Sequence, residues 1–189
     1  MSRVHLIHGA FNKNASGWDQ LFDELALAEY RPLTRHYGWV GPITTEARSR
    51  EAGERLAEDV RPGDHVIAFS NGGLVCWHAL EVGMECDRVV LIMPALQRDA
   101  TFGAGANKII VLHNSGDWAV EASRIWSWLN PFGWASGWGA MGRKGPATGD
   151  VRVQAIDTES EYGTRGHLSW REEDGDYWIP RIAQLLEGP

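Results

Sequence analysis

The stretch HVIAFSNGGLVCW, residues 65–77, decides the fold expected for this chain. It joins the short apolar run Val66–Phe69 to a helical segment, Gly72–Val82, through a turn that begins at Ser70. A strand that enters a helix through so sharp a turn holds its serine in a strained backbone conformation and exposes the hydroxyl. The next N–H groups lie at a helix N-terminus, where they can bind negative charge. The stretch therefore indicates a nucleophilic serine between a strand and a helix, and a Ser-Asn-Gly-Gly turn without chemistry is the structural alternative.

Other short apolar runs of about strand length follow the same pattern and end in Gly, Pro, Asn or Ser. The expected strands are Val4–Ile7, Leu33–Tyr37, Val66–Phe69, Val89–Met93, Ile109–Leu112 and, more polar and nearer a sheet edge, Val151–Ile156. The expected helices are Trp18–Glu29, Thr45–Val60, Gly72–Val82, Ala119–Leu129 and Tyr177–Leu186. This alternation predicts one domain over residues 1–189 of the α/β class, with a doubly wound, mostly parallel sheet and helices on both faces in three layers.

Composition narrows the classes of partner. The chain has 189 residues, a formal net charge of −7 and no long basic run, which argues against a nucleic-acid partner. No stretch approaches the ~20 apolar residues that span a bilayer, and the N-terminal apolar run is too short for a signal peptide, so we expect a cytoplasmic protein. Two cysteines, Cys76 and Cys86, are too few for a disulfide scaffold. The sequence leaves the oligomeric state open.

Two more residues carry chemistry, each beyond a different expected strand. Asp117 lies in IIVLHNSGDWAV and His167 in YGTRGHLSW, so the order along the chain is Ser70, Asp117, His167. In open parallel sheets, ligands bind at the carboxyl ends of the strands, where these three side chains would converge. Asp157, which also follows a strand, is the rival acid. Asp117 as a plain turn residue and His167 as a surface histidine are the structural alternatives.

The chain resembles the α/β-hydrolases, most closely the small members without a cap domain. The resemblance rests on His8-Gly9 after the first strand, Trp18 before the first helix, the serine turn, the acid turn at Asp117 and the histidine loop at Gly166-His167. It departs from the family's G-x-S-x-G pattern at Ala68, which stands where the first glycine is expected. The short stretch Gln97–Lys108, where many relatives insert a cap, implies an open site.

The resemblance implies a catalytic triad and an oxyanion hole. Ser70 would be the nucleophile, His167 its base, and Asp117 the group that holds the imidazole in the right tautomer. Backbone N–H groups of Asn71 and of Ala10 or Phe11 would stabilise the oxyanion. The expected function is cleavage of small or medium carboxylic esters through an acyl-enzyme. The alternatives are a thioesterase, amidase or lyase that uses the same site, and a catalytically silent binding protein of the same fold.

No cofactor is expected, because this chemistry needs none and no nucleotide-binding glycine pattern occurs. No metal is expected either, because the histidines in or beside apolar runs lack a shared ligand spacing; these are His5, His65, His78 and His113.

The segment Asn130–Asp150 is unusually long and irregular for a compact domain. It carries Trp134 and Trp138, which we expect to form aromatic walls of the substrate pocket. The alternative is that these two tryptophans only pin down a glycine-rich loop.

Overall fold

A computed structural model describes residues 1–9, 18–35, 45–117 and 139–187 of the chain. Its centre is a sheet of six strands in the order β2-β1-β3-β4-β5-β6, and all five neighbouring pairs are parallel. The strands are β1 (Arg3–Ile7), β2 (Arg31–Arg35), β3 (His65–Phe69), β4 (Cys86–Ile92), β5 (Ala106–His113) and β6 (Val153–Asp157). The expected doubly wound parallel sheet is confirmed.

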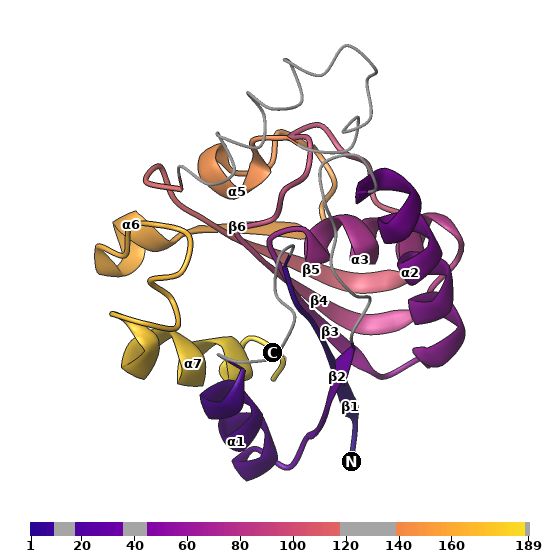
Figure 1. Ribbon diagram of the computed structural model, residues 1–189, viewed down its shortest axis with the longest axis horizontal. Helices are drawn as coiled ribbons and strands as arrows, with labels where there is room; N and C mark the ends of the chain where they lie inside the picture. Colours follow the sequence, from indigo (N-terminus) through magenta and orange to yellow (C-terminus); the bar gives the residue numbers. More distant parts are fainter. Residues whose placement is uncertain (10–17, 36–44, 118–138, 188–189) are drawn as a thin grey trace.

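Helices cover both faces of this sheet (Figure 1). One face carries α1 (Asp19–Leu27) and α7 (Gly175–Gln184), and the other carries α2 (Thr45–Asp59) and α3 (Gly72–Glu81). Two shorter helices, α5 (Met141–Lys144) and α6 (Thr158–Tyr162), were not expected from the sequence. The expected helix Ala119–Leu129 lies outside the described residues. The three-layer arrangement predicted above is therefore the observed one.

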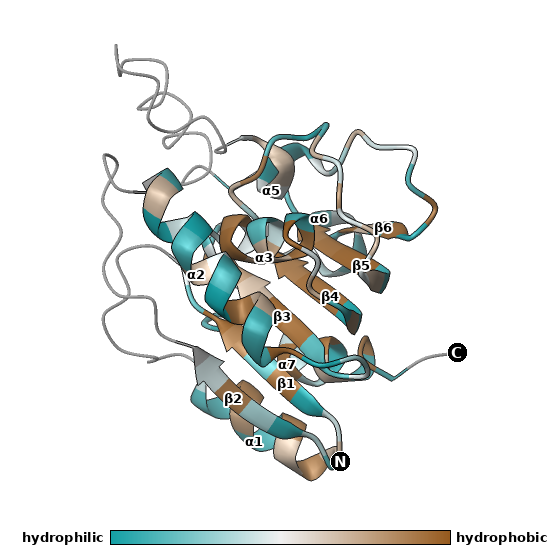
Figure 2. Cartoon of the chain, turned by 90° about the vertical axis from the view of Figure 1, so that its right-hand side faces the viewer, coloured by the Kyte–Doolittle hydropathy of each residue, from teal (hydrophilic) through white to brown (hydrophobic). Residues whose placement is uncertain are grey.

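The unbroken apolar runs of the strands follow from this covering. Val66 and Ala68 pack in the core under α2 and α3, whereas Ile67 and Phe69 pack in the core under α1 and α7. Successive residues of a strand point to opposite faces, so a strand covered on both sides is apolar at every position. Figure 2 shows this as hydrophobic colouring along β3, β4 and β5.

The two outermost strands differ from the central ones. β6, at one edge, has three exposed or half-exposed residues before its one buried residue, Ile156, which confirms the expected edge position. β2, at the other edge, begins at Arg31, two residues before the predicted start at Leu33. Arg31 pairs with Arg3 of β1, which accounts for the early start, because backbone pairing does not depend on an apolar side chain.

The order of the strands reverses between β1 and β3. The chain leaves β1 toward β2 on one side, then returns to β3 and continues toward β6 on the other. At such a switch point, the loops beyond two adjacent strands run in opposite directions and leave a crevice at the carboxyl edge. The loop that begins with His8 and the turn at Ser70 both lie there.

Candidate active site

Ser70 occupies the turn between β3 and α3 in a left-handed backbone conformation, with φ of 54°. Its N–H donates to the Ile92 carbonyl at 2.9 Å, and its carbonyl accepts from the N–H groups of Gly73 at 3.0 Å and Ala95 at 3.1 Å. A serine in this region of backbone space is uncommon and needs such anchoring. The residue is only half-buried. The expected strained serine turn is therefore present, and the bond to Ile92 anchors it to β4.

Glycines let the neighbouring backbones approach this turn. A Cβ on Gly9, just beyond β1, would lie 3.0 Å from the Cβ of Ser70. A Cβ on Gly72, in the first turn of α3, would lie 2.5 Å from the Ile7 carbonyl oxygen. The loop after β1 therefore runs directly against Ser70, and the N-terminus of α3 rests on the end of β1.

Asp117 and His167 meet across the carboxyl edge of the sheet. Nδ1 of His167 lies 2.9 Å from Oδ1 and 3.0 Å from Oδ2 of Asp117. The carboxyl group is fully buried, whereas the imidazole keeps 15% of its side chain exposed. A carboxylate on Nδ1 holds the proton there and leaves Nε2 as the basic nitrogen. The acid and base proposed from the sequence are thus in contact.

Phe69 connects this pair to the serine turn. Its ring centroid lies 4.7 Å from that of His167, and the guanidinium carbon of Arg171 lies 5.5 Å from the same ring centroid. Because Phe69 directly precedes Ser70, the imidazole packs against the neighbour in sequence of the residue that bears the hydroxyl. Within the described part of the chain, no hydrogen bond joins the Ser70 hydroxyl to His167.

Asn71, one of the three residues expected at the oxyanion hole, is the N-cap residue of α3. Its side chain is buried and its Nδ2 donates to the hydroxyl of Ser49 on α2 at 3.2 Å. This bond anchors the first residue of the α3 N-terminus to α2. The other two expected donors, Ala10 and Phe11, lie outside the described residues, as do Trp134 and Trp138.

The rival acid, Asp157, has a different role. It is the N-cap of α6, where its carboxylate accepts from the N–H of Glu159 at 3.1 Å and from the N–H and hydroxyl of Ser160 at 3.4 and 2.9 Å. A carboxylate occupied in this way stabilises the start of a helix. Asp117, and not Asp157, is the acid that contacts His167.

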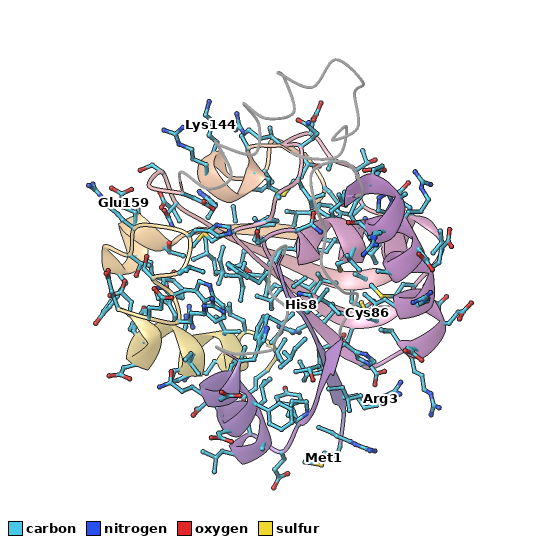
Figure 3. The ribbon with its side chains drawn as sticks, in the orientation of Figure 1. Met1, Arg3, His8, Cys86, Lys144 and Glu159 are labelled. Atoms are coloured by element: carbon cyan, nitrogen blue, oxygen red, sulfur yellow. The ribbon has the colours of Figure 1, made fainter. Side chains whose placement is uncertain are left out.

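The carboxyl edge is capped by residues that the sequence did not single out. The N–H of Met141 donates to the Leu96 carbonyl and that of Gly142 to the Pro94 carbonyl, both at 2.9 Å. The N–H of Asn114 in turn donates to the Gly142 carbonyl at 3.0 Å. The segment at α5 thus bridges the ends of β4 and β5. Figure 3 shows Lys144 of α5 and Glu159 of α6 at the opposite end of the molecule from Arg3.

Among the described residues, no group of three or more His, Cys, Asp or Glu side chains is placed to hold a metal ion. In the same part of the chain, every helix is too short or too polar to cross a membrane.

Comparison with solved structures identifies the fold. A protein from Xanthomonas campestris pv. campestris, assigned to the alpha/beta hydrolase superfamily, superposes with a TM-score of 0.62 at 15% identity over 99% of both chains. A monoacylglycerol lipase from Paleococcus ferrophilus superposes with a TM-score of 0.59 at 12% identity, over 97% of this chain and 93% of that one. An esterase from Pyrococcus furiosus superposes with a TM-score of 0.56 at 16% identity, over 98% of this chain and 82% of that one. No protein-family model and no curated protein matches the sequence. The chain has the fold of the α/β-hydrolase superfamily.

Proposed function

We propose that this chain is a serine hydrolase that cleaves carboxylic esters of small or medium acyl and alcohol groups. The observation that carries the proposal is the buried Asp117 carboxylate on Nδ1 of His167, at the same sheet edge as a serine with positive φ. A histidine held in this tautomer presents a basic nitrogen, and a serine hydroxyl at a helix N-terminus is the nucleophile such a base activates.

The reaction proceeds in two halves. Oγ of Ser70 attacks the ester carbonyl while Nε2 of His167 takes the hydroxyl proton, and the carbonyl oxygen becomes an oxyanion. The intermediate collapses, the C–O bond to the alcohol breaks, and His167 returns the proton to the leaving alkoxide. Water then attacks the acyl-serine by the same route and releases the carboxylic acid. Asp117 stabilises the imidazolium formed in each half.

The start of α3 supplies charge stabilisation. The backbone N–H of Asn71 lies at the N-terminus of this helix, and such N–H groups favour the developing negative charge. A second donor from Ala10 or Phe11 is part of the proposal. Loss of one oxyanion donor typically costs about 2.7–4 kcal/mol of transition-state stabilisation.

The folds that resemble this one include an esterase and a monoacylglycerol lipase, which supports an ester as the substrate. The proposed site uses only side chains and backbone groups of this chain.

The test is labelling with a fluorophosphonate probe, followed by hydrolysis of p-nitrophenyl esters of increasing acyl length. The unmodified protein should be labelled and should turn over the short esters, and Ser70→Ala should lose both without unfolding. Ser115→Ala is the matched control, since Ser115 is an exposed serine at the same edge, in the turn that leads to Asp117. A folded Ser70→Ala protein with undiminished turnover would refute the proposal.

A further inference from the structure

Asn114 directly follows β5 and stands three residues before Asp117. Its carbonyl accepts the N–H of Asp117 at 3.2 Å, which closes the turn that carries the acid. Its side chain is fully buried, so water does not compete for its amide group. The backbone of Asn114 thus closes the acid turn, and its side chain takes no part in that bond.

That side chain binds the residue before the base. Nδ2 of Asn114 donates to the Gly166 carbonyl at 3.2 Å, and Oδ1 accepts the Gly166 N–H at 3.1 Å. A planar amide that satisfies both backbone groups of one residue fixes the orientation of that residue as well as its position. Since His167 comes next in the chain, this pair of bonds sets the origin of the imidazole side chain.

The amide nitrogen of Asn114 has two further polar neighbours. Nδ2 lies 3.3 Å from the hydroxyl of Thr158 and 3.3 Å from the sulfur of Met93. The Thr158 hydroxyl lies 3.4 Å from the Thr164 carbonyl, and the Thr164 hydroxyl accepts from the indole N–H of Trp178 at 2.7 Å. The amide is therefore the start of a buried polar chain that reaches from the end of β5 to α7.

The acid turn, which carries Gly116, and the histidine loop, which carries Gly166, are in close contact. A Cβ on Gly116 would lie 3.1 Å from the Cβ of Arg165 and 3.2 Å from the N of Gly166. Gly166 has a φ of 104°, in the region that favours glycine. Neither loop can fill the space of a missing amide, so loss of that side chain leaves two backbone groups of Gly166 without their partner.

We propose that Asn114 is a positioning residue that locks the acid turn to the histidine loop and thereby aligns Nδ1 of His167 with Asp117. Its consequence for catalysis rests on the function proposed above, whereas its effect on the Asp117–His167 pair does not. The locked pair places Nε2 in one orientation and removes the entropy cost of ordering the base at each turnover.

The experiment compares Asn114→Leu, which is similar in size but lacks the amide, with Thr158→Val, which removes the adjacent hydroxyl and leaves both bonds to Gly166. Two quantities are measured in each folded variant: kcat and KM for a p-nitrophenyl ester, and the downfield proton NMR signal of the His167 Nδ1–H bonded to Asp117. Asn114→Leu should lose the signal and lower kcat roughly 10- to 100-fold, with KM within about twofold. Thr158→Val should keep the signal and a kcat within about twofold, even where its stability drops.

A third measurement uses the unmodified protein and covers the case in which Asn114→Leu does not fold. The Gly166 amide should exchange with deuterium at least about tenfold more slowly than an unstructured glycine, although it lies in a loop. Exchange at the free-peptide rate overturns the proposal, as does a folded Asn114→Leu protein that keeps the Nδ1 signal. A protein that shows the signal and a protected Gly166, yet is not labelled by a fluorophosphonate, refutes the proposed function and leaves the lock standing.

Discussion

Oδ1 of Asp117 lies 2.9 Å from Nδ1 of His167, and the carboxyl group that makes this contact is fully shielded from solvent. The two residues are 50 positions apart in the chain: Asp117 follows β5, and His167 lies in the loop between α6 and α7. An ionised carboxylate removed from water is stable only with such a partner. The proposed function assigns this pair the roles of acid and base, and that assignment can be tested directly.

Asp117→Asn should lower kcat for an ester about 10³- to 10⁴-fold, because the amide no longer holds the required tautomer of His167. Asp157→Ala serves as the control, since Asp157 caps α6. It should keep kcat within about twofold and cost about 1 kcal/mol of unfolding free energy. Steady-state kinetics and urea unfolding of both variants decide the matter. The reverse pattern of effects would move the acid to Asp157.

Gly72→Ala should destabilise the protein by about 1–3 kcal/mol, because the new methyl group would press on the Ile7 carbonyl oxygen, 2.5 Å away, and push α3 off β1. Ester turnover should fall as well, since the displaced helix carries Asn71 and adjoins Ser70. Gly149→Ala, where nothing lies within 4 Å of the added Cβ, should change stability by less than about 0.5 kcal/mol. Equal unfolding midpoints for the two variants would contradict this account of the contact.

Stability should fall as the pH drops below about 6.5, the ordinary pKa of histidine. Burial lowers the pKa of His78 in the folded protein, although the Glu46 carboxylate lies 3.2 Å from its Nε2 and opposes the shift. Burial lowers the pKa of His65 in the same way. Well above pH 6.5, these two histidines are neutral in both the folded and the unfolded protein. Below it the unfolded chain takes up protons that the folded chain excludes, so the free energy of unfolding decreases until the lowered folded pKa is reached.

The check is urea unfolding at pH 7, 6 and 5. Each such histidine contributes a slope of up to about 1.4 kcal/mol per pH unit between its unfolded and folded pKa. His78→Leu should therefore flatten the decline relative to the unmodified protein. An unchanged pH dependence in this variant would show that the folded state does not lower the pKa of His78.

Trp134→Ala and Trp138→Ala should raise KM for long-chain or aromatic esters more than for acetate esters, with the unfolding temperature largely kept. The reason is that aromatic side chains near an acyl site bind apolar substrate groups. Both positions lie outside the described residues, so this prediction rests on the sequence. Equal effects on all chain lengths, or a large loss of thermal stability, would assign these tryptophans to packing.

Much of the fold could be read from local patterns. The apolar runs around Val66 and Ile109 are unbroken because helices cover both faces of a parallel sheet, and that covering leaves its mark in the sequence itself. The weaker pattern ending at Ile156 marked an edge strand for the same reason. Because every parallel strand ends at one edge, the positions of Ser70 and Asp117 after their strands were enough to predict their side of the sheet.

Contacts between loops left no such mark. The helix at Thr158 is one and a half turns long and depends on its cap at Asp157, so no helical period could reveal it or separate a capping aspartate from a catalytic one. Asn114 looked like any turn residue, because its function lies in two bonds to Gly166, 52 positions away. Periodicity reports which face of an element is buried, whereas the pairing of buried polar groups depends on which loops the folded sheet brings together.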